Sequence, residues 1–109
     1  MEYLYYIVYK TTNTVNNMWY IGQHKTNKLD DGYLGSGTAL KAAIKVFGKD
    51  KFNREILHIF NNEADMDNKE KELVTLTEVF NKNCYNKIEG GRQAGYLEHL
   101  RQIRKFTKE

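Results

Sequence analysis

Glu70 is a charged residue at a position where the sequence pattern favours an apolar one. The spacing of apolar residues predicts a helix over 63–80, and Glu70 falls within its apolar arc, between Met66 and Val74. Glu72 falls on the opposite side of the same helix. A helix that docks by this arc must bury Glu70 at least in part. A buried carboxylate costs on the order of several kcal/mol unless it is paired, hydrogen-bonded or bound to a cation.

Two interpretations of Glu70 stay open from the pattern alone. In the first, its carboxylate pairs with a lysine or a tyrosine hydroxyl of the core, or lies at the edge of the helix interface. In the second, it is a metal ligand or an acid–base group in a cleft. The choice between them depends on which residues the fold brings next to Glu70.

Tyrosine is the second residue type that could do chemistry, with eight copies in 109 residues. Tyr9 ends one predicted strand and Tyr20 lies in the next, so a hairpin between them brings the two phenols together. A phenol in a polar site can orient a water molecule or accept a proton. His24 follows in a loop that contains glycines. The ordinary interpretation, as core and rim aromatics, applies to Tyr3, Tyr5, Tyr6 and Tyr85.

The first part of the chain predicts a β-hairpin and a long loop. Residues 3–9 are β-branched and aromatic and apolar on both faces, which is typical of a central strand. Residues 11–17 (TTNTVNN) have the composition of a turn, and residues 18–21 predict a second strand that Gly22 ends. Residues 23–37 lack periodicity and contain three glycines, which indicates a functional or mobile loop.

A helix and a third strand follow this loop. Ser36 or Thr38 is expected to cap the helix, which runs to Phe47 and stops at Gly48. Residues 52–60 (FNREILHIF) then predict a strand.

The last part of the chain predicts helix, loop and tail. Asn61 and Asn62 open the helix over 63–80, whose early acidic residues suit the positive end of the helix dipole. Residues 81–91 predict a loop, and residues 95–106 predict a basic terminal helix. The expected element order is therefore β-β-α-β-α followed by a tail.

Composition excludes several classes of protein. A chain of 109 residues is expected to fold as one domain, and it has no apolar run near the roughly 20 residues of a membrane-spanning helix. Cys84 is the single cysteine, which excludes an internal disulfide and a cysteine-based zinc site. The first residues lack the basic segment of a signal peptide, so we expect a cytoplasmic protein and no membrane partner.

The net charge of +3 is too small by itself to indicate a nucleic-acid partner, but it is unevenly distributed. Residues 1–60 hold eight basic and five acidic residues, and residues 90–109 hold five and two. Residues 61–89 hold four basic and seven acidic residues. The chain is thus basic at both ends and acidic between them.

Two tripeptides carry a resemblance to a known family. Residues 7–9 (IVY) and 20–22 (YIG), with Tyr20 eleven positions after Tyr9, resemble the signature of the GIY-YIG nuclease superfamily, with Ile in place of the first Gly. The resemblance extends over residues 3–91 through Glu70-x-x-Leu73-Val74 and through Tyr85-Asn86 near a Gly-Gly pair. The stretches GQHK (22–25) and DGYLGSG (31–37) resemble the phage-borne, homing-type endonucleases of that superfamily.

This resemblance implies a fold, an activity and a set of roles. The implied fold is a small α/β (α+β) domain over 1–91, with a three-stranded antiparallel sheet flanked by helices, followed by a basic tail or helix over 92–109. The implied activity is hydrolysis of DNA phosphodiesters with one Mg²⁺ or Mn²⁺ ion. Tyr9 would orient or deprotonate the attacking water, Tyr20 would hydrogen-bond at the scissile phosphate, Glu70 would hold the metal ion, and Asn86 would support the site.

The protonation state of Tyr9 needs help from a neighbour. A phenol with an ordinary pKa near 10 is a poor base at neutral pH. Some neighbouring group must lower that pKa or relay the proton, and we expect His24 or Lys25 to do so.

One departure from the resemblance concerns the phosphate contacts. Many members carry an arginine on the first helix and a histidine or tyrosine one turn later, whereas this sequence has no arginine before Arg54. Lys25 or Lys28 could supply the charge and Tyr33 the second role, although lysine cannot bind a phosphate bidentately as arginine can.

The basic residues near the first helix and in the tail are candidate DNA contacts, with a solvated basic face as the ordinary alternative. The candidates are Lys28, Lys41, Lys45, Arg92, Arg101 and Arg104.

The function predicted from these observations is a metal-dependent endonuclease acting on double-stranded DNA, in the host-cell cytoplasm if the gene is phage-borne. The alternative is a DNA-binding module of the same fold that cleaves weakly or not at all, and a weaker third is an unrelated protein-interaction domain. Homing-type enzymes usually append a separate recognition module, and only about eighteen residues follow Gly91. Four alternatives therefore stay open: a compact chain with weak sequence specificity, recognition by loops, recognition by a homo-oligomer, or recognition by a missing segment.

Overall fold

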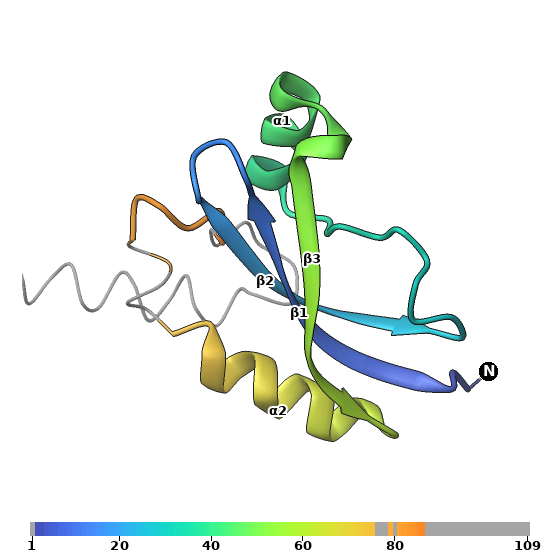
Figure 1. Cartoon of the computed structure of the whole chain (residues 1–109). Helices are drawn as coiled ribbons and strands as arrows, with labels where there is room; N and C mark the ends of the chain where they lie inside the picture. The colour runs from blue at the N-terminus through green and yellow to red at the C-terminus, as the bar shows by residue number, and fades with distance from the viewer. Residues whose placement is uncertain (1, 76–78, 80, 87–109) are drawn as a thin grey trace, which may run out of the picture.

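The computed structural model describes residues 2–75, 79 and 81–86 of the chain. It has an α+β fold in which two α-helices and one short 3-10 helix accompany a three-stranded antiparallel sheet (Figure 1). The elements are β1 (Tyr5–Asn13), β2 (Trp19–Thr26), α1 (Thr38–Phe47), η1 (Lys49–Lys51), β3 (Phe52–Phe60) and α2 (Glu63–Leu73). The predicted fold class and the order β-β-α-β-α are confirmed.

β1 is the central strand of the sheet, with β2 on one side and β3 on the other. Its sequence explains this position, because Ile7 and Val8 alternate between the two faces and both are fully buried. Tyr9 lies opposite Gly22 of β2 and Ile56 of β3, and the pairing with β3 shifts register just before that point. β2 is therefore an outer strand whose residues can meet both α2 and the loops.

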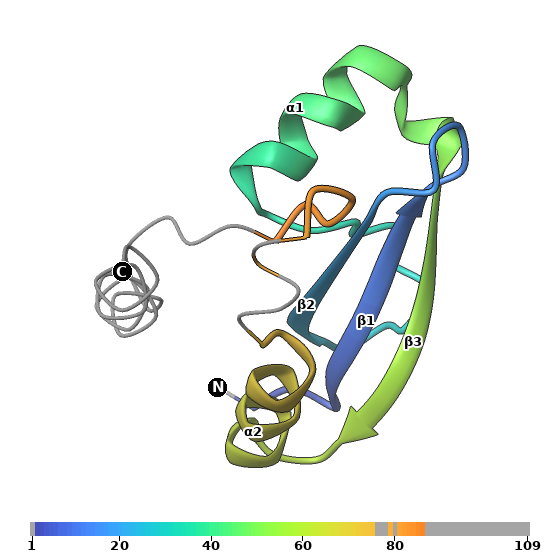
Figure 2. The same cartoon turned by 90° about the vertical axis from the view of Figure 1, so that its left-hand side faces the viewer.

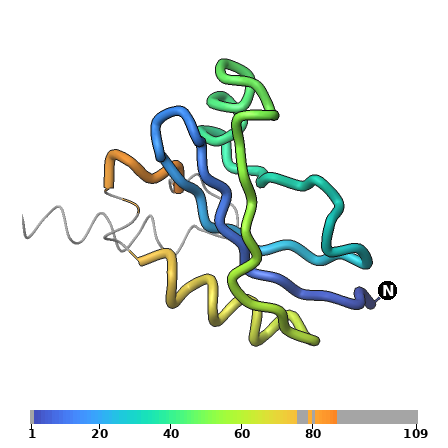
Figure 3. The backbone as a smooth tube through the Cα atoms, in the orientation of Figure 1, coloured from blue at the N-terminus to red at the C-terminus, as the bar shows by residue number. Residues whose placement is uncertain are grey.

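Different segments cover the two faces of the sheet. On one face, Val8 and Ile21 pack with Met66 of α2. The other face meets the connection between β2 and α1, because Thr11 Oγ1 donates to the carbonyl of Leu34 at 2.6 Å. Figure 2 shows α1 and α2 toward opposite ends of the strands, and Figure 3 traces the teal connection from the end of β2 back to α1.

Both strands of the hairpin extend beyond their predicted ends. β1 continues through Thr11 and Asn13, in a segment whose composition indicated a turn. These polar side chains can be buried because they have partners: Thr11 bonds the loop carbonyl, and Asn13 Nδ2 donates to Tyr85 Oη at 3.1 Å. Gly22 does not end β2, which continues to Thr26, so the prediction that this glycine stops the strand is wrong.

The helix caps differ in how well the sequence predicted them. α1 begins after Gly37 without a side-chain cap, so neither Ser36 nor Thr38 has the predicted role. Glycine suits this cap because a Cβ there would lie 2.7 Å from the Tyr20 ring. Asn62 caps α2 as predicted, accepting a hydrogen bond from a backbone N–H of the first turn.

α2 ends at Leu73, earlier than the predicted end at residue 80. Val74 leaves helical geometry, and its side chain is buried in the same cluster as Met66. Residues 76–78 and 80, the predicted helix over 95–106 and the tail over 92–109 lie outside the described residues. In the part of the chain that the structure describes, no helix combines the length and the apolar character needed to cross a membrane.

Candidate active site

The candidate active site is built around five consecutive residues of β2. They are Tyr20, Ile21, Gly22, Gln23 and His24. Because side chains alternate along a strand, Tyr20, Gly22 and His24 face the connection to α1. Ile21 and Gln23 face α2. β2 can therefore join groups from the loop side of the sheet to groups from the helix side.

The Tyr9 phenol lies across Gly22. Its Oη is only 2.6 Å from the point where a Cβ of Gly22 would lie, so a side chain at that position would displace the phenol. Tyr9 is 1% exposed, and its ring centroid is 6.3 Å from that of Tyr20 and 6.0 Å from that of Tyr33. The predicted meeting of Tyr9 and Tyr20 across the hairpin is confirmed.

Three glycines enclose the ring of Tyr20. A Cβ built at Gly22, Gly35 or Gly37 would lie 2.8, 2.9 or 2.7 Å from a ring carbon. Gly35 also has a φ of +137°, which a residue with a side chain rarely adopts. The glycines of the loop therefore allow the backbone to close on this ring and hold its plane.

The surroundings of Tyr9 favour its neutral form. Burial is the largest cause that raises the pKa of the Tyr9 phenol, and the nearby Tyr20, Tyr33 and Glu70 raise it further. Arg54 acts in the opposite direction but does not offset them. Of the two alternatives for Tyr9, the surroundings thus exclude a lowered pKa and leave the relay of the proton by a neighbour. The side chain is a neutral hydroxyl at physiological pH.

His24 belongs to a network around Asp31. The His24 ring stacks on Tyr33 at a centroid distance of 3.9 Å and an angle of 12°, and its Nε2 lies 2.7 Å from Asp31 Oδ2. Thr26 Oγ1 and the Tyr33 backbone N–H also donate to Asp31, at 2.8 and 3.1 Å. Desolvation opposes ionisation of Asp31, but these hydrogen bonds and the His24 ring outweigh it and hold the Asp31 pKa well below its usual range.

The charge of Asp31 determines how the His24 ring is protonated. An ionised carboxylate only accepts hydrogen bonds, so the proton of a neutral His24 ring lies on Nε2. Nδ1 is then the nitrogen that can take up a proton. The sequence indicated His24 as a candidate but did not indicate Asp31 as its partner.

Arg54 of β3 is a residue that the sequence interpretation missed. Its Nη1 donates to the Tyr33 carbonyl at 2.9 Å and lies 3.3 Å from Asp31 Oδ1, and its Nη2 donates to the Leu29 carbonyl. The guanidinium carbon lies 5.7 Å from the centre of the Tyr9 ring. Arg54 thus ties the loop after β2 to the sheet and brings a positive charge beside Tyr9.

A signal for Arg54 was present in the sequence. It alternates with Phe52 and Ile56 along β3, so a regular strand directs all three side chains to one face. A charged residue between two apolar ones on a buried face is the same kind of anomaly as Glu70, in a strand instead of a helix.

Lys25 does not join the Tyr9 group. Its Nζ pairs with Glu63 Oε1 of α2 at 3.0 Å, on the side of the sheet where Gln23 meets the same helix. Of the two residues predicted to relay the proton, His24 lies on the side of the sheet that carries Tyr9 and Tyr33, and Lys25 lies on the other side.

Glu70 faces the sheet, as the helical wheel predicted. It is half-buried, and Gln23 Nε2 donates to its Oε1 at 2.7 Å. Glu72 points outward, with 66% of its side chain exposed and Lys69 Nζ at 3.0 Å. Glu70 is also close enough for its charge to raise the pKa of Tyr9. The fold thus brings the carboxylate of α2 into the electrostatic field of the tyrosine group.

Asn86 holds the backbone of β2. Its Oδ1 accepts from the N–H of Ile21 at 2.8 Å, and its Nδ2 donates to the carbonyl of Ile21 at 2.6 Å. The side chain is buried and replaces the pairing that a further strand would give to Ile21. Asn86 therefore positions the backbone between Tyr20 and Gly22.

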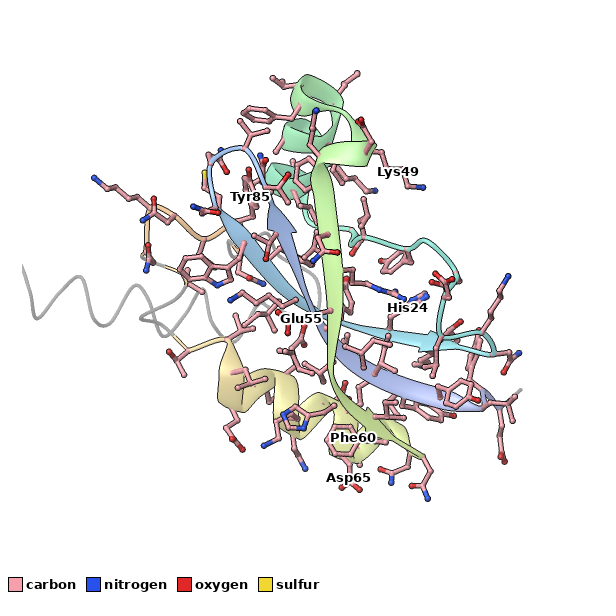
Figure 4. All side chains as sticks on the ribbon, in the orientation of Figure 1. His24, Lys49, Glu55, Phe60, Asp65 and Tyr85 are labelled. Carbon is pink, nitrogen blue, oxygen red and sulfur yellow. The ribbon has the colours of Figure 1, made fainter. Side chains whose placement is uncertain are left out.

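The predicted DNA contacts fall partly within the described structure. Lys28 lies in the loop after β2, and Lys41 and Lys45 lie on α1; all three are exposed. Arg92, Arg101 and Arg104 lie outside the described residues. A pocket of about 470 Å³ beside this loop is lined in part by His24, Tyr33, Ile44 and Lys49. Lys49, labelled with His24 in Figure 4, adds a basic group that the sequence analysis did not select.

The donors around Glu70 fit a hard divalent cation with few protein ligands. Within residues 2–75, 79 and 81–86 there is no group of three or more His, Cys, Asp or Glu side chains that could chelate a metal. A single carboxylate beside an amide suits Mg²⁺, which often keeps several waters and takes one or two carboxylates together with substrate phosphate. Glu70, with the Gln23 amide beside it, is thus the candidate site for one such ion.

Comparison with known proteins relates the chain to endonucleases of phage T4. It is 46% identical over 110 residues to "Endonuclease segA", covering 98% of this chain and 50% of that protein. It is 44% identical over 88 residues to "Putative endonuclease segE" and 43% identical over 98 residues to "Putative endonuclease segC". These alignments cover 81% and 90% of this chain and 43% and 49% of those proteins.

The chain spans about half the length of the curated relatives it matches. No protein-family model matches it, and no solved structure matches it. The comparisons thus establish homology to phage T4 proteins named as endonucleases, and the homologous region includes the elements that carry the candidate site.

Proposed function

We propose that this chain is a DNA endonuclease domain of the GIY-YIG type that hydrolyses phosphodiester bonds with one bound Mg²⁺ or Mn²⁺ ion. The observation that carries the proposal is the convergence on β2 of Tyr9, Tyr20, the His24–Tyr33 pair and Glu70, which come from β1, β2, the connecting loop and α2. Homology to phage T4 endonucleases supports it independently. The substrate is double-stranded DNA.

Each residue of this site has a role that its surroundings allow. Glu70 holds the cation, which when bound neutralises charge on the phosphoryl oxygens and stabilises the leaving oxygen. Tyr9, kept neutral by burial, orients the attacking water through its hydroxyl. Tyr20, with its ring held by glycines, directs its hydroxyl to a phosphate oxygen. These assignments need no ionised tyrosine.

The proton released by the attacking water is assigned to His24. Asp31 holds the Nε2 proton of a neutral His24 ring, so Nδ1 is the basic nitrogen. Water attacks phosphorus, the bond to the leaving oxygen breaks, and His24 takes up the proton. Asp31 and Arg54 act as positioning residues, because they hold His24 and the loop but face no reacting atom.

Plasmid nicking with Mg²⁺ and with chelator tests the proposal. The wild-type protein is expected to relax or linearise supercoiled plasmid in Mg²⁺ and to leave it intact in chelator. Glu70→Gln should reduce the cleavage rate by at least about 100-fold because the metal ligand is removed. Glu72→Gln is the matched control on the outer side of the same helix and should cleave like the wild type. Full activity of Glu70→Gln, or loss of activity in Glu72→Gln, contradicts the proposal.

One observation favours the alternative of a DNA-binding module that cleaves weakly or not at all. Arg54 is the one arginine in the described part of the chain, and its guanidinium hydrogen-bonds two loop carbonyls. Phosphate binding in this region then depends on lysines, which lack the bidentate geometry of arginine. Wild-type protein that shifts plasmid on a gel but leaves it supercoiled in Mg²⁺ supports this alternative over the enzyme.

A further inference from the structure

Gln23 contains a buried polar atom without a partner. Its Nε2 donates to Glu70 Oε1 at 2.7 Å, but its Oε1 is buried and accepts no hydrogen bond, the one such side-chain atom in the described ranges. Leaving a buried acceptor unsatisfied costs about 1–3 kcal/mol. A polar side chain retained at this cost beside a half-buried carboxylate calls for an explanation.

The direction of the Gln23 amide follows from the charge of Glu70. With the nitrogen toward the carboxylate, the amide makes one hydrogen bond and leaves its oxygen unsatisfied. The reversed amide would place two oxygen acceptors against each other, which is unfavourable unless a cation lies between them. Amide and carboxylate oxygens are both ligands of hard divalent cations. A bound cation would therefore reverse the preference of the Gln23 amide.

We propose that Gln23 is a second protein ligand of the cation held by Glu70, donating Nε2–H to the carboxylate without the ion and turning Oε1 to it when it binds. This inference rests on the proposed function, because it assumes that Glu70 binds a divalent cation. Among the residues that the structure describes, no three His, Cys, Asp or Glu side chains gather to chelate a metal ion. A second ligand from Gln23 explains how a site with one carboxylate can bind the cation.

The position of Gln23 in β2 makes this role specific to the site. It directly follows Gly22, which underlies the Tyr9 phenol, and precedes His24, which stacks on Tyr33. A metal ligand at this position joins the cation to the segment of β2 that carries Tyr20 and lies under the Tyr9 phenol. The relative placement of ion and tyrosines would then be set by one strand as well as by the docking of α2.

Mn²⁺ binding to the protein without DNA tests the inference independently of cleavage. Isothermal titration calorimetry and electron paramagnetic resonance of free Mn²⁺ are applied to the wild type, Gln23→Leu, Gln23→Glu, Glu70→Gln and the control Glu72→Gln. We expect Gln23→Leu to bind Mn²⁺ at least about tenfold more weakly than the wild type, and Glu70→Gln to lose binding. Glu72→Gln should bind like the wild type.

Gln23→Glu provides a second measurement that does not depend on Gln23→Leu folding well. Two carboxylates at this point repel each other without a cation, so the melting temperature in chelator should fall below that of the wild type. Mn²⁺ should raise the melting temperature of Gln23→Glu by more than it raises that of the wild type. The affinity of Gln23→Glu for Mn²⁺ should be about tenfold higher than that of the wild type.

The outcomes separate this inference from the proposed function. If Gln23→Leu binds Mn²⁺ as tightly as the wild type or more tightly, the amide only competes with the cation for Glu70 and the inference is wrong. If Gln23→Glu gains neither affinity nor stabilisation by Mn²⁺, the inference is also wrong. If the wild type binds no Mn²⁺, or Glu70→Gln binds it equally well, both the inference and the metal site of the proposed function are wrong.

Discussion

At the scale of single residues, the site depends on side chains whose burial conflicts with their chemistry. Tyr9 is an almost fully buried phenol, Glu70 a half-buried carboxylate, and Arg54 a guanidinium with only a tenth of its side chain exposed. Each is held by polar partners or by an aromatic ring. Conflicts of this kind concentrate at functional sites, because stability alone would favour apolar residues there.

The ionisation of Tyr9 gives a prediction at this scale. Its pKa is raised in the folded state, so its contribution to stability is fully present below the pKa near 10 of an unfolded tyrosine and is lost as the pH rises above that value. Ultraviolet titration of native wild type and Tyr9→Phe up to roughly pH 11 should therefore count the same number of ionising tyrosines.

The unfolded proteins supply the control for this titration. In denaturant, the wild type should show one more ionising tyrosine than Tyr9→Phe, since burial no longer protects the phenol. A native wild type that already shows the extra phenolate below pH 10 contradicts the neutral Tyr9 on which the proposed mechanism depends.

At the scale of elements, β2 organises the site and α2 and the loop complete it. The strand carries Gly22 under the Tyr9 phenol and Gln23 under Glu70. Asn86 holds its backbone at Ile21 from outside the sheet. An outer strand suits this purpose, because a ligand can approach it from its open side while the sheet fixes its register.

Gly22→Ala tests the close packing of this strand. The added Cβ would lie 2.6 Å from Tyr9 Oη and 2.8 Å from a Tyr20 ring carbon, so both phenols must move. We expect a decrease of about 1–3 kcal/mol in the free energy of unfolding, measured with urea, and a loss of cleavage larger than Tyr9→Phe alone produces.

A double-mutant cycle identifies the cause of that decrease. Tyr9→Phe removes the atom nearest the new methyl group, so Gly22→Ala should be less destabilising in that background, with a coupling energy of about 0.5–1 kcal/mol. Strictly additive effects of the two substitutions would show that the Tyr9 hydroxyl does not lie over Gly22 in solution.

At the scale of the whole molecule, the distribution of charge bears on how the proposed DNA substrate is held. The described part offers exposed lysines on α1 and on the adjoining loop, near the pocket that His24 and Lys49 line. The phage T4 relatives are about twice as long as this chain. In the proposed function, these exposed lysines contact phosphates of the DNA, which supply affinity without sequence information.

Substitution of the α1 lysines tests this interpretation. Lys41→Gln with Lys45→Gln should weaken DNA binding and lower the slope of log affinity against log salt by about 0.9 for each phosphate that the protein no longer neutralises. Lys71→Gln, an exposed lysine of α2, is the matched control and should change neither quantity. An unchanged salt slope in the α1 variant would assign these lysines to the solvated face instead. Fluorescence anisotropy with labelled duplex DNA measures both.

The sequence by itself determined the element order, the inward direction of Glu70 and the meeting of Tyr9 with Tyr20. These follow from local periodicity, because 3.6-residue and two-residue repeats report which side of a helix or strand faces the core. Predictions from local sequence were wrong at Gly22, which was expected to end a strand, and at Thr11, which was expected to lie in a turn. Both residues lie within strands. Their reasons are tertiary: a phenol lying over the glycine, and a loop carbonyl bonded by the threonine.

Only the tertiary structure decided which polar groups meet. Arg54 meets Asp31 and Tyr33 across 23 and 21 positions of sequence. Gln23 meets Glu70 across 47 positions. Periodicity gives the direction of a side chain but not the identity of its partner. That identity depends on strand register and helix docking, which arise from the packing of the whole core. The chemistry of single residues was therefore readable from the sequence, whereas the protonation states and the neighbours of Glu70 were properties of the fold.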